Sequence, residues 1–165
     1  MNVLNHHSRT MPVSIAEVGK VLDTLASPDD RLWPSHAWPA MRFDRPLQVG
    51  ASGGHGPVRY VVESYVPGQA VTFRFAAPRG FLGTHAFSVT PCAGGTVLSH
   101  TISMQALGIG ALSWALVFRP LHDALLEDAL TKAEQSLTGR GTPIAWSVYV
   151  RILRFFLRRR SRRSP

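Results

Sequence analysis

Apolar and polar residues alternate along the middle of the chain, and glycine or proline interrupts the alternation at regular intervals. This pattern predicts β-strands, with turns at the interruptions. In the last four expected strands the apolar residues share one face, which is typical of an antiparallel sheet with one face toward solvent. An N-terminal segment, Met1–Val13, could add an extended edge. The other expected strands are Met41–Val49, Pro57–Val66, Val71–Ala77, Gly83–Thr90 and Thr96–Ala106.

The turn between the second and third of these strands predicts their register. If Pro67–Ala70 forms a four-residue loop, Val66 pairs with Val71 and Val62 pairs with Phe75. A shift by one residue would set apolar positions against polar ones, so we expect this register.

A helix is expected before the sheet. Ser14 and Glu17 have the capping-box spacing, and apolar residues follow at helical intervals, which predicts a helix over Ile15–Ala26. Pro28–Trp33 could continue as a second short helical piece. The segment Gly50–Gly56 is rich in glycine but lacks the lysine of a phosphate-binding loop, so we interpret it as a flexible hairpin loop.

A long helix is expected after the sheet, over Gly108–Leu137, because a broad apolar stripe runs from Phe118 onward. Pro120 either starts this helix or kinks it, and Gly139 is a suitable stop. Asp128 and Lys132 have the spacing of an ion pair between successive helical turns.

Charge is distributed unevenly along the 165 residues. The net charge of +8 belongs to the segment after Gly139, which holds eight arginines and no acidic residue, whereas residues 1–139 hold ten basic and ten acidic residues. A folded surface for specific nucleic-acid binding is therefore not expected, because such surfaces spread positive charge over the domain. We expect two parts: a domain over residues 1–138, and a linker with a basic tail over residues 139–165.

The tail has the pattern of a basic amphipathic helix, which is typical of segments that lie on an anionic membrane surface. Two alternatives stay open: a helix packed on the body with a solvated basic face, or a tail that contacts RNA nonspecifically. The residues expected to contact the membrane are Arg151, Ile152, Leu153, Arg154, Phe156 and Arg158.

Further features of the sequence indicate the cellular compartment of the protein. The single cysteine, Cys92, cannot form an internal disulfide, and no apolar run reaches the ~18–20 residues of a membrane-spanning helix. The polar N-terminus lacks the apolar core of a signal peptide. We therefore expect a cytoplasmic protein, held peripherally at the inner membrane face if the tail binds there.

Three segments, Tyr65–Phe75, Gly83–Pro91 and Gly94–His100, together with the order of elements, resemble the START-like (SRPBCC) superfamily, which includes polyketide cyclases and lipid-transfer domains. The resemblance runs from about Arg9 to Leu137. It implies an α+β fold, the helix-grip, in which a curved antiparallel sheet wraps around the long C-terminal helix and encloses an apolar cavity. The superfamily has no universal catalytic motif, so the resemblance assigns no catalytic residue.

Two histidines lie on the expected apolar faces of neighbouring strands. A four-residue loop at Cys92–Gly95 places His85 opposite Ile102 and His100 opposite Phe87, so the two histidines become diagonal neighbours. They could anchor the polar group of a ligand in an apolar pocket, or they could be buried histidines satisfied by the Tyr60 hydroxyl, backbone or water. The residues expected to line the pocket are Tyr60, Val62, Phe73, Phe75, His85, Phe87, His100, Ile102, Met104, Trp114 and Phe118.

These expectations favour a noncatalytic protein that binds a hydrophobic small molecule or lipid. The alternative is a polyketide cyclase or dehydratase in which His85 and His100 act as general acid and base. No cofactor is expected, and the histidine spacing predicts no metal site. We assign no oligomeric state from the sequence.

Overall fold

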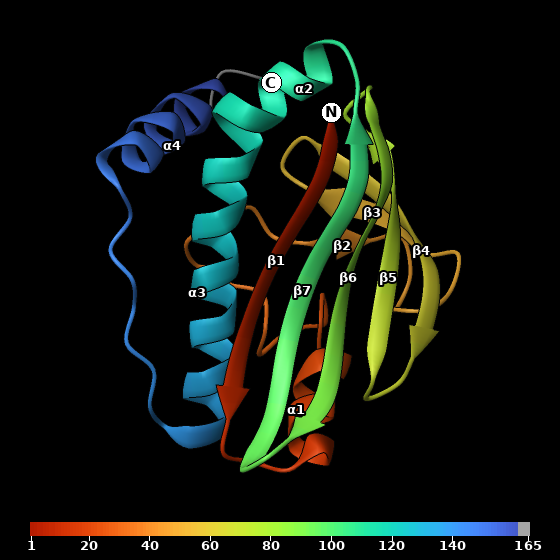
Figure 1. Cartoon of the computed structure of the whole chain (residues 1–165), viewed down its shortest axis with the longest axis vertical. Helices are drawn as coiled ribbons and strands as arrows, with labels where there is room; N and C mark the ends of the chain where they lie inside the picture. Colours follow the sequence, from red (N-terminus) through yellow and green to blue (C-terminus); the bar gives the residue numbers. More distant parts are fainter. Residues whose placement is uncertain (162–165) are drawn as a thin grey trace.

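The computed structural model describes the backbone of residues 1–161 and the side chains of residues 1–157. Within the described chain, seven strands form one antiparallel sheet in the order β1-β7-β6-β5-β4-β3-β2 (Figure 1). The strands are β1 (Asn2–Met11), β2 (Arg42–Phe43), β3 (Ser52–His55), β4 (Val58–Val66), β5 (Ala70–Ala77), β6 (Phe81–Cys92) and β7 (Gly95–Ala106).

The helical segments cover one side of this sheet. In Figure 1, α3 runs alongside the strands, while α1 and α2 lie at opposite ends of the molecule. The expected α+β fold, a curved antiparallel sheet with a long C-terminal helix, is confirmed. The helices are α1 (Ile15–Asp23), α2 (Ile109–Ser113), the π-helical segment η1 (Trp114–Phe118), α3 (Arg119–Thr138) and α4 (Val148–Ser161).

The hairpin of β6 and β7 has the expected register. His85 pairs with Ile102 and Phe87 pairs with His100, so the diagonal relation between the two histidines is confirmed. The extended N-terminal segment is also confirmed, because β1 pairs along β7 as an edge of the sheet.

The expected register of β4 and β5 is wrong. Val66 pairs with Ala70, and Val62 pairs with Phe73, because the ladder is irregular between Val62 and Ser64. An extra residue at Glu63 shifts the alternation of the strand by one position. Val66 is consequently exposed instead of facing the core.

The strand expected over Met41–Val49 is also wrong, since only Arg42 and Phe43 pair in β2. Pro46 cannot donate to a ladder, and the Asp44 carboxylate accepts the backbone N–H of Ser52 at 2.9 Å, which turns the chain. The glycine-rich segment is not a free loop, because it contributes β3. A side chain at Gly53 would lie 2.0 Å from the Arg42 carbonyl, so the close approach of β2 requires glycine there.

The second short helix expected over Pro28–Trp33 is absent, and turns connect these residues. The Asp30 carboxylate accepts the N–H groups of Ala26, Leu32 and Trp33 at 2.6–2.8 Å, which replaces helical hydrogen bonding. Ala26 has φ of 61°, so α1 ends earlier than expected, at Asp23. The capping box of Ser14 and Glu17 is present as expected.

The long helix expected over Gly108–Leu137 is divided into α2, η1 and α3, and α2 turns away from the axis of α3 (Figure 1). The hydrogen bonding changes at η1, which ends two residues before Pro120. Pro120 therefore lies in the first turn of α3, where its missing N–H costs little. Gly139 has φ of 66° and ends α3 as expected. No helix within the described residues is both long and apolar enough to cross a membrane.

Candidate functional site

A cavity of about 160 Å³ lies between the sheet and the helical layer. Its wall is almost wholly apolar and aromatic apart from four histidines, one from the end of β3, two from the central strands and one from α3. The strands contribute His55, Val58, Phe75, Phe81, His85, His100 and Ile102; the helices contribute Trp114, Val117, Phe118, Leu121, His122, Leu125, Leu126 and Leu157; and the connecting segments contribute Trp33, Trp38, Pro39, Gly56 and Pro57.

The expected pocket residues divide into two groups. Six of them line the cavity: Phe75, His85, His100, Ile102, Trp114 and Phe118. The other five do not line it, because they are packed within the surrounding core: Tyr60, Val62, Phe73, Phe87 and Met104. The alternation in the strands predicts which residues face inward. It does not predict which of these residues pack in the core and which line the cavity.

Two lining histidines, His55 and His122, were not expected at the site. His122 occupies the apolar stripe of α3 one turn after Phe118, and this position could have identified it. His55 lies at the end of β3, in the glycine-rich segment, where no periodicity indicates a face. Its Nδ1 lies 3.0 Å from the Tyr60 hydroxyl, and its ring centroid lies 4.6 Å from that of Trp33.

The central polar feature of the cavity is a hydrogen bond between two histidines. Nδ1 of His85 lies 3.2 Å from Nε2 of His100, and both side chains are buried. Burial holds the pKa of each imidazole well below its ordinary value, so both rings are neutral near pH 7. Their remaining nitrogens, His85 Nε2 and His100 Nδ1, have no partner among the described side chains.

A hydrogen-bonded pair of neutral histidines offers a ligand a defined set of hydrogen-bonding groups. A neutral imidazole carries one N–H donor and one acceptor nitrogen. The ring that donates the shared hydrogen bond keeps a free acceptor nitrogen. The ring that accepts it keeps a free N–H donor. The two remaining nitrogens are therefore always one donor and one acceptor.

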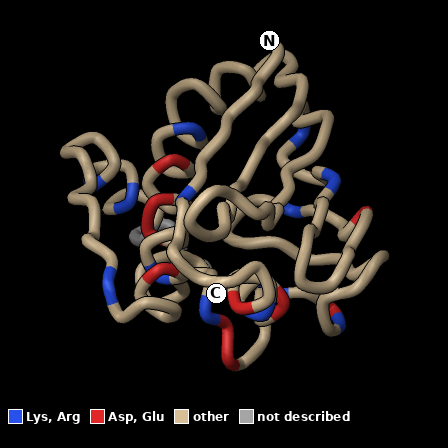
Figure 2. The backbone as a smooth tube through the Cα atoms, turned by 60° about the horizontal axis from the view of Figure 1, so that its bottom comes forward, with Lys and Arg blue, Asp and Glu red and all other residues tan. Residues whose placement is uncertain are grey.

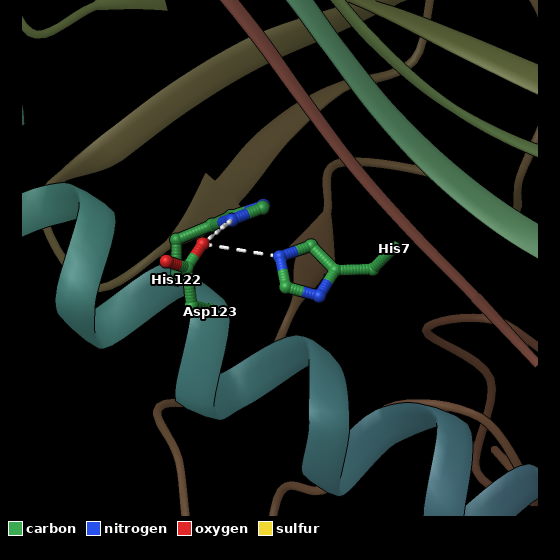
Figure 3. A group of neighbouring side chains, drawn as sticks. All are labelled: His7, His122 and Asp123. Carbon is green, nitrogen blue, oxygen red and sulfur yellow. Dashed lines mark hydrogen bonds and ion pairs between the residues drawn. The ribbon is translucent and has the colours of Figure 1, made fainter. Parts of the chain in front are cut away.

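A third group of titratable side chains joins β1 to α3, beside the cavity (Figure 3). His7 Nε2 lies 3.0 Å from Asp123 Oδ1, and His122 Nδ1 lies 3.7 Å from the same oxygen. The other nitrogen of His7 contacts Glu127 Oε1 at 3.0 Å. The hydrogen bond with Asp123 is the main cause that raises the pKa of His7, so the charged form is favoured.

These contacts continue along the strand at every second residue. Asn5 donates to Asp123 at 2.9 Å, and Arg9 forms ion pairs with Glu127 and Glu134. Alternate residues of a strand therefore meet successive turns of a helix. His7, His122 and Asp123 offer ligand atoms within 4.8 Å of one another, a spacing that could hold a metal ion. The hydrogen bonds of His7 to the carboxylates of Asp123 and Glu127 account for the arrangement of this group.

The helix α4 packs against α3 and closes one side of the cavity through Leu157. Its anchor is Arg154, whose side chain is only 7% exposed. The guanidinium lies 4.0 Å from the ring of Trp38 and 3.9 Å from that of Trp146, and it donates to the Ala37 carbonyl at 2.5 Å. The expectation that Arg154 contacts a membrane is therefore wrong for this docked arrangement.

The other expected membrane contacts lie on different sides of α4. Arg151, Ile152 and Phe156 are exposed, whereas Leu153 is half-buried. The side chain of Arg158 lies outside the described residues.

The ion pair expected between Asp128 and Lys132 is wrong, because each side chain has other partners. Asp128 Oδ2 accepts the indole N–H groups of Trp38 and Trp146 at 2.7 and 2.9 Å. Lys132 donates to the carbonyls of Asp30 and Trp33 at 2.7 and 2.6 Å, which fixes the segment that brings Trp33 to the cavity.

Comparison with known proteins gives structural likeness without sequence likeness. No family model matches the chain, and no curated protein matches its sequence. The structure of norcoclaurine synthase from Thalictrum flavum, in complex with dopamine and hydroxybenzaldehyde, is similar with a TM-score of 0.63 at 11% identity, covering 86% of this chain and 90% of that one.

Two further structures show the same likeness. An uncharacterised protein from Rhizobium leguminosarum has a TM-score of 0.59 at 14% identity, covering 85% of this chain and 97% of that one. The di-domain aromatase/cyclase StfQ of steffimycin biosynthesis has a TM-score of 0.62 at 14% identity, with 85% of this chain covering 52% of that one. With the sheet order and the long C-terminal helix, these likenesses show that the chain has the START-like (SRPBCC) fold.

Proposed function

We propose that this protein binds a compact hydrophobic small molecule that carries a hydroxyl group, in the cavity between the sheet and α3. The observation that carries the proposal is the neutral pair of His85 and His100, hydrogen-bonded to each other in a wall whose other residues, apart from His55 and His122, are mainly apolar. Ligand pockets usually combine apolar surface with a few polar groups that orient the ligand.

The size of the cavity limits the ligand. A cavity of about 150 Å³ lined by apolar side chains accommodates benzene, so about 160 Å³ suits a single aromatic ring or a short acyl segment. The chemistry of the histidine pair adds a second limit, because one free nitrogen donates and the other accepts. A hydroxyl group, which also donates and accepts, satisfies both. Norcoclaurine synthase, similar in fold, is described with two single-ring hydroxyl compounds, which supports this class.

Binding of phenol and toluene, measured by isothermal titration, tests this function. We expect both to bind and phenol to bind more tightly. His85→Phe should remove the preference for phenol, and Ile102→Trp, which fills the cavity, should abolish binding of both. Val66→Ser, on the exposed surface, is the control and should bind as the wild type does. Equal binding by the Ile102→Trp variant would refute the proposal.

A second candidate is an acid–base enzyme that acts on an aromatic substrate in the same cavity. The complementary histidine nitrogens favour it: the acceptor nitrogen takes a proton from substrate carbon while the donor nitrogen gives one to a carbonyl oxygen. Transfer across the shared hydrogen bond leaves both rings neutral with their tautomers exchanged. Solvent deuterium exchange into the methyl group of hydroxyacetophenone tests it, and exchange equal to that of a His100→Phe variant would eliminate it.

We further propose that the exposed face of α4 contacts an anionic membrane surface. Ile152 and Phe156 are exposed there beside Arg151, and the arginines of this segment have no acidic neighbour in sequence. Insertion of apolar side chains and attraction of arginine to anionic lipid act in the same direction. Ile152→Ser with Phe156→Ser should abolish sedimentation with anionic vesicles, and unchanged sedimentation would refute the contact.

A further inference from the structure

The docked helix α4 turns an arginine toward the body of the protein and a phenylalanine toward solvent. Its inward side holds Val150, Leu153 and Arg154, whereas Ile152 and Phe156 point away from the body, Phe156 with 63% exposure. A helix that only packed on the body would bury its phenylalanine and expose its arginine, because burial of a charge is unfavourable unless it is paired. The apolar side of α4 therefore remains available while α4 stays docked through Arg154.

A second exposed apolar surface lies next to α4. Ile109, Leu112 and Leu116 follow one another at helical spacing along α2 and η1, and they are 78%, 57% and 52% exposed. Tyr149 of α4 donates to the Leu116 carbonyl at 2.6 Å, so the two surfaces adjoin. Single exposed leucines are ordinary, but contiguous exposed apolar residues on two neighbouring helices mark an interaction site.

The charge around this surface indicates its partner. No acidic residue occurs between Glu63 and Asp123, and none follows Gly139. Arg79 is exposed in the turn that packs against Gly110 of α2, and Arg151 is exposed on α4. Arg119, which follows η1, is also exposed, and its guanidinium lies 3.8 Å from the Asp123 carboxylate. Eight of the ten acidic residues lie along α3 or in and just after α1, and the other two, Asp44 and Glu63, lie after β2 and in β4 (Figure 2). An apolar surface with a basic rim complements an anionic bilayer.

We infer that α2 and η1 join α4 in one membrane-binding surface, made of Ile109, Leu112, Leu116, Tyr149, Ile152 and Phe156, so that this end of the molecule rests on an anionic bilayer. The inference rests on the proposed membrane contact of α4 and adds the second element and the orientation. Val117 and Leu157, from the same elements, line the cavity, so the surface adjoins the cavity wall. The opposite end, which holds α1 and the turn at Cys92, faces away from the bilayer (Figure 1).

Flotation with vesicles of equal parts phosphatidylcholine and phosphatidylglycerol tests the surface, with pure phosphatidylcholine vesicles as reference. We expect the wild type to bind the anionic vesicles only. Leu112→Ser with Leu116→Ser should weaken binding about tenfold or more, since two apolar insertions are lost. Ile15→Ser with Val66→Ser replaces exposed apolar residues near the opposite end and should leave binding unchanged.

The outcomes separate the two membrane proposals. If the Leu112/Leu116 variant binds as the wild type does while Ile152→Ser with Phe156→Ser loses binding, the further inference is wrong and the contact of α4 survives. If the wild type fails to bind anionic vesicles, both are wrong. Binding of a single-stranded RNA that survives both double substitutions, without vesicle binding, would assign the basic segment to nucleic acid.

The orientation has its own readout. Cys92 is the single cysteine of the chain and is exposed, so a polarity-sensitive dye on it reports the far end directly. Anionic vesicles should leave this signal unchanged but should shift the emission of the same dye on Leu112→Cys in a Cys92→Ser background. A shift at Cys92 without one at position 112 would reverse the orientation and overturn the inference.

Discussion

The Tyr149 hydroxyl donates to the Leu116 carbonyl at 2.6 Å. In a regular α-helix that carbonyl would accept the N–H of residue 120, but residue 120 is proline and has none. The side chain of α4 therefore takes the place of the missing helical donor. The lack of a backbone N–H at Pro120 thus leaves an acceptor in η1 to which α4 is attached.

Arg154 should control the docking of α4. Arg154→Ala removes the guanidinium that contacts the rings of both Trp38 and Trp146, and a desolvated cation–π contact contributes about 2 kcal/mol. We expect faster hydrogen exchange of the α4 amides and faster proteolysis of the segment between α3 and α4.

Arg151→Ala is the matched control, because Arg151 is exposed on the same helix. It should exchange as the wild type does. Equal protection of α4 in the Arg154→Ala variant would show that the contacts of Arg154 with the two indole rings do not anchor the helix.

Stability should fall in mild acid because of the buried histidines. Burial lowers the pKa of His55 to about 3 and lowers those of His85 and His100 well below the ordinary value of 6.5. The unfolded chain therefore binds these protons first, and stability is lost as pH falls below 6.5. Each such group reduces the free energy of unfolding by about 1.4 kcal/mol per pH unit in that range. His7 acts in the opposite sense, because its raised pKa gives stability that is lost as pH rises.

The contribution of one histidine can be separated by substitution. His85→Phe should flatten the pH dependence of the unfolding free energy between about pH 6 and pH 5 by up to about 1.4 kcal/mol per unit. Exposed His36 serves as control, and His36→Ala should keep the wild-type slope. Urea unfolding at each pH gives the measurement, and an unchanged slope for His85→Phe would contradict the neutral state of His85.

Asp30 should stabilise the segment that carries Trp33 to the cavity. Asp30→Ala removes an acceptor shared by three backbone N–H groups and should lower the free energy of unfolding by about 2–3 kcal/mol. Asp29 is exposed next to it, so Asp29→Ala should change the stability little. If urea unfolding finds the two variants equally stable, the turn does not depend on the carboxylate.

The sequence predicts the parts of the fold in which local pattern and packing agree. The hairpin at Cys92–Gly95 has alternation on both strands and a turn of definite length, so the contact between His85 and His100 could be predicted. At Glu63 the prediction from the pattern is wrong. A bulge is not visible in the sequence of apolar and polar residues, but it moves every later side chain of β4 to the opposite face of the sheet.

The candidate site could be predicted only in part. Phe75, Ile102 and Phe118 follow from the inward faces of their elements. Trp38 reaches the cavity through an irregular segment whose shape depends on tertiary hydrogen bonds, such as that between Trp38 and Asp128, and His55 reaches it through the short glycine-containing strand β3, which has no hydrophobic alternation. Arg154 is the opposite case: a helical wheel assigns arginine to solvent, but the indole rings of the distant Trp38 and of Trp146, just before α4, make a buried position favourable.

Binding of a ring-sized ligand oriented by the histidine pair can be seen most directly in a crystal of the protein grown with 4-iodophenol. We expect one strong anomalous iodine peak inside the cavity, beside Phe118, with the ligand hydroxyl about 3 Å from His85 Nε2 or His100 Nδ1. A cavity filled by its own side chains, with iodine bound only at the surface, would contradict this expectation.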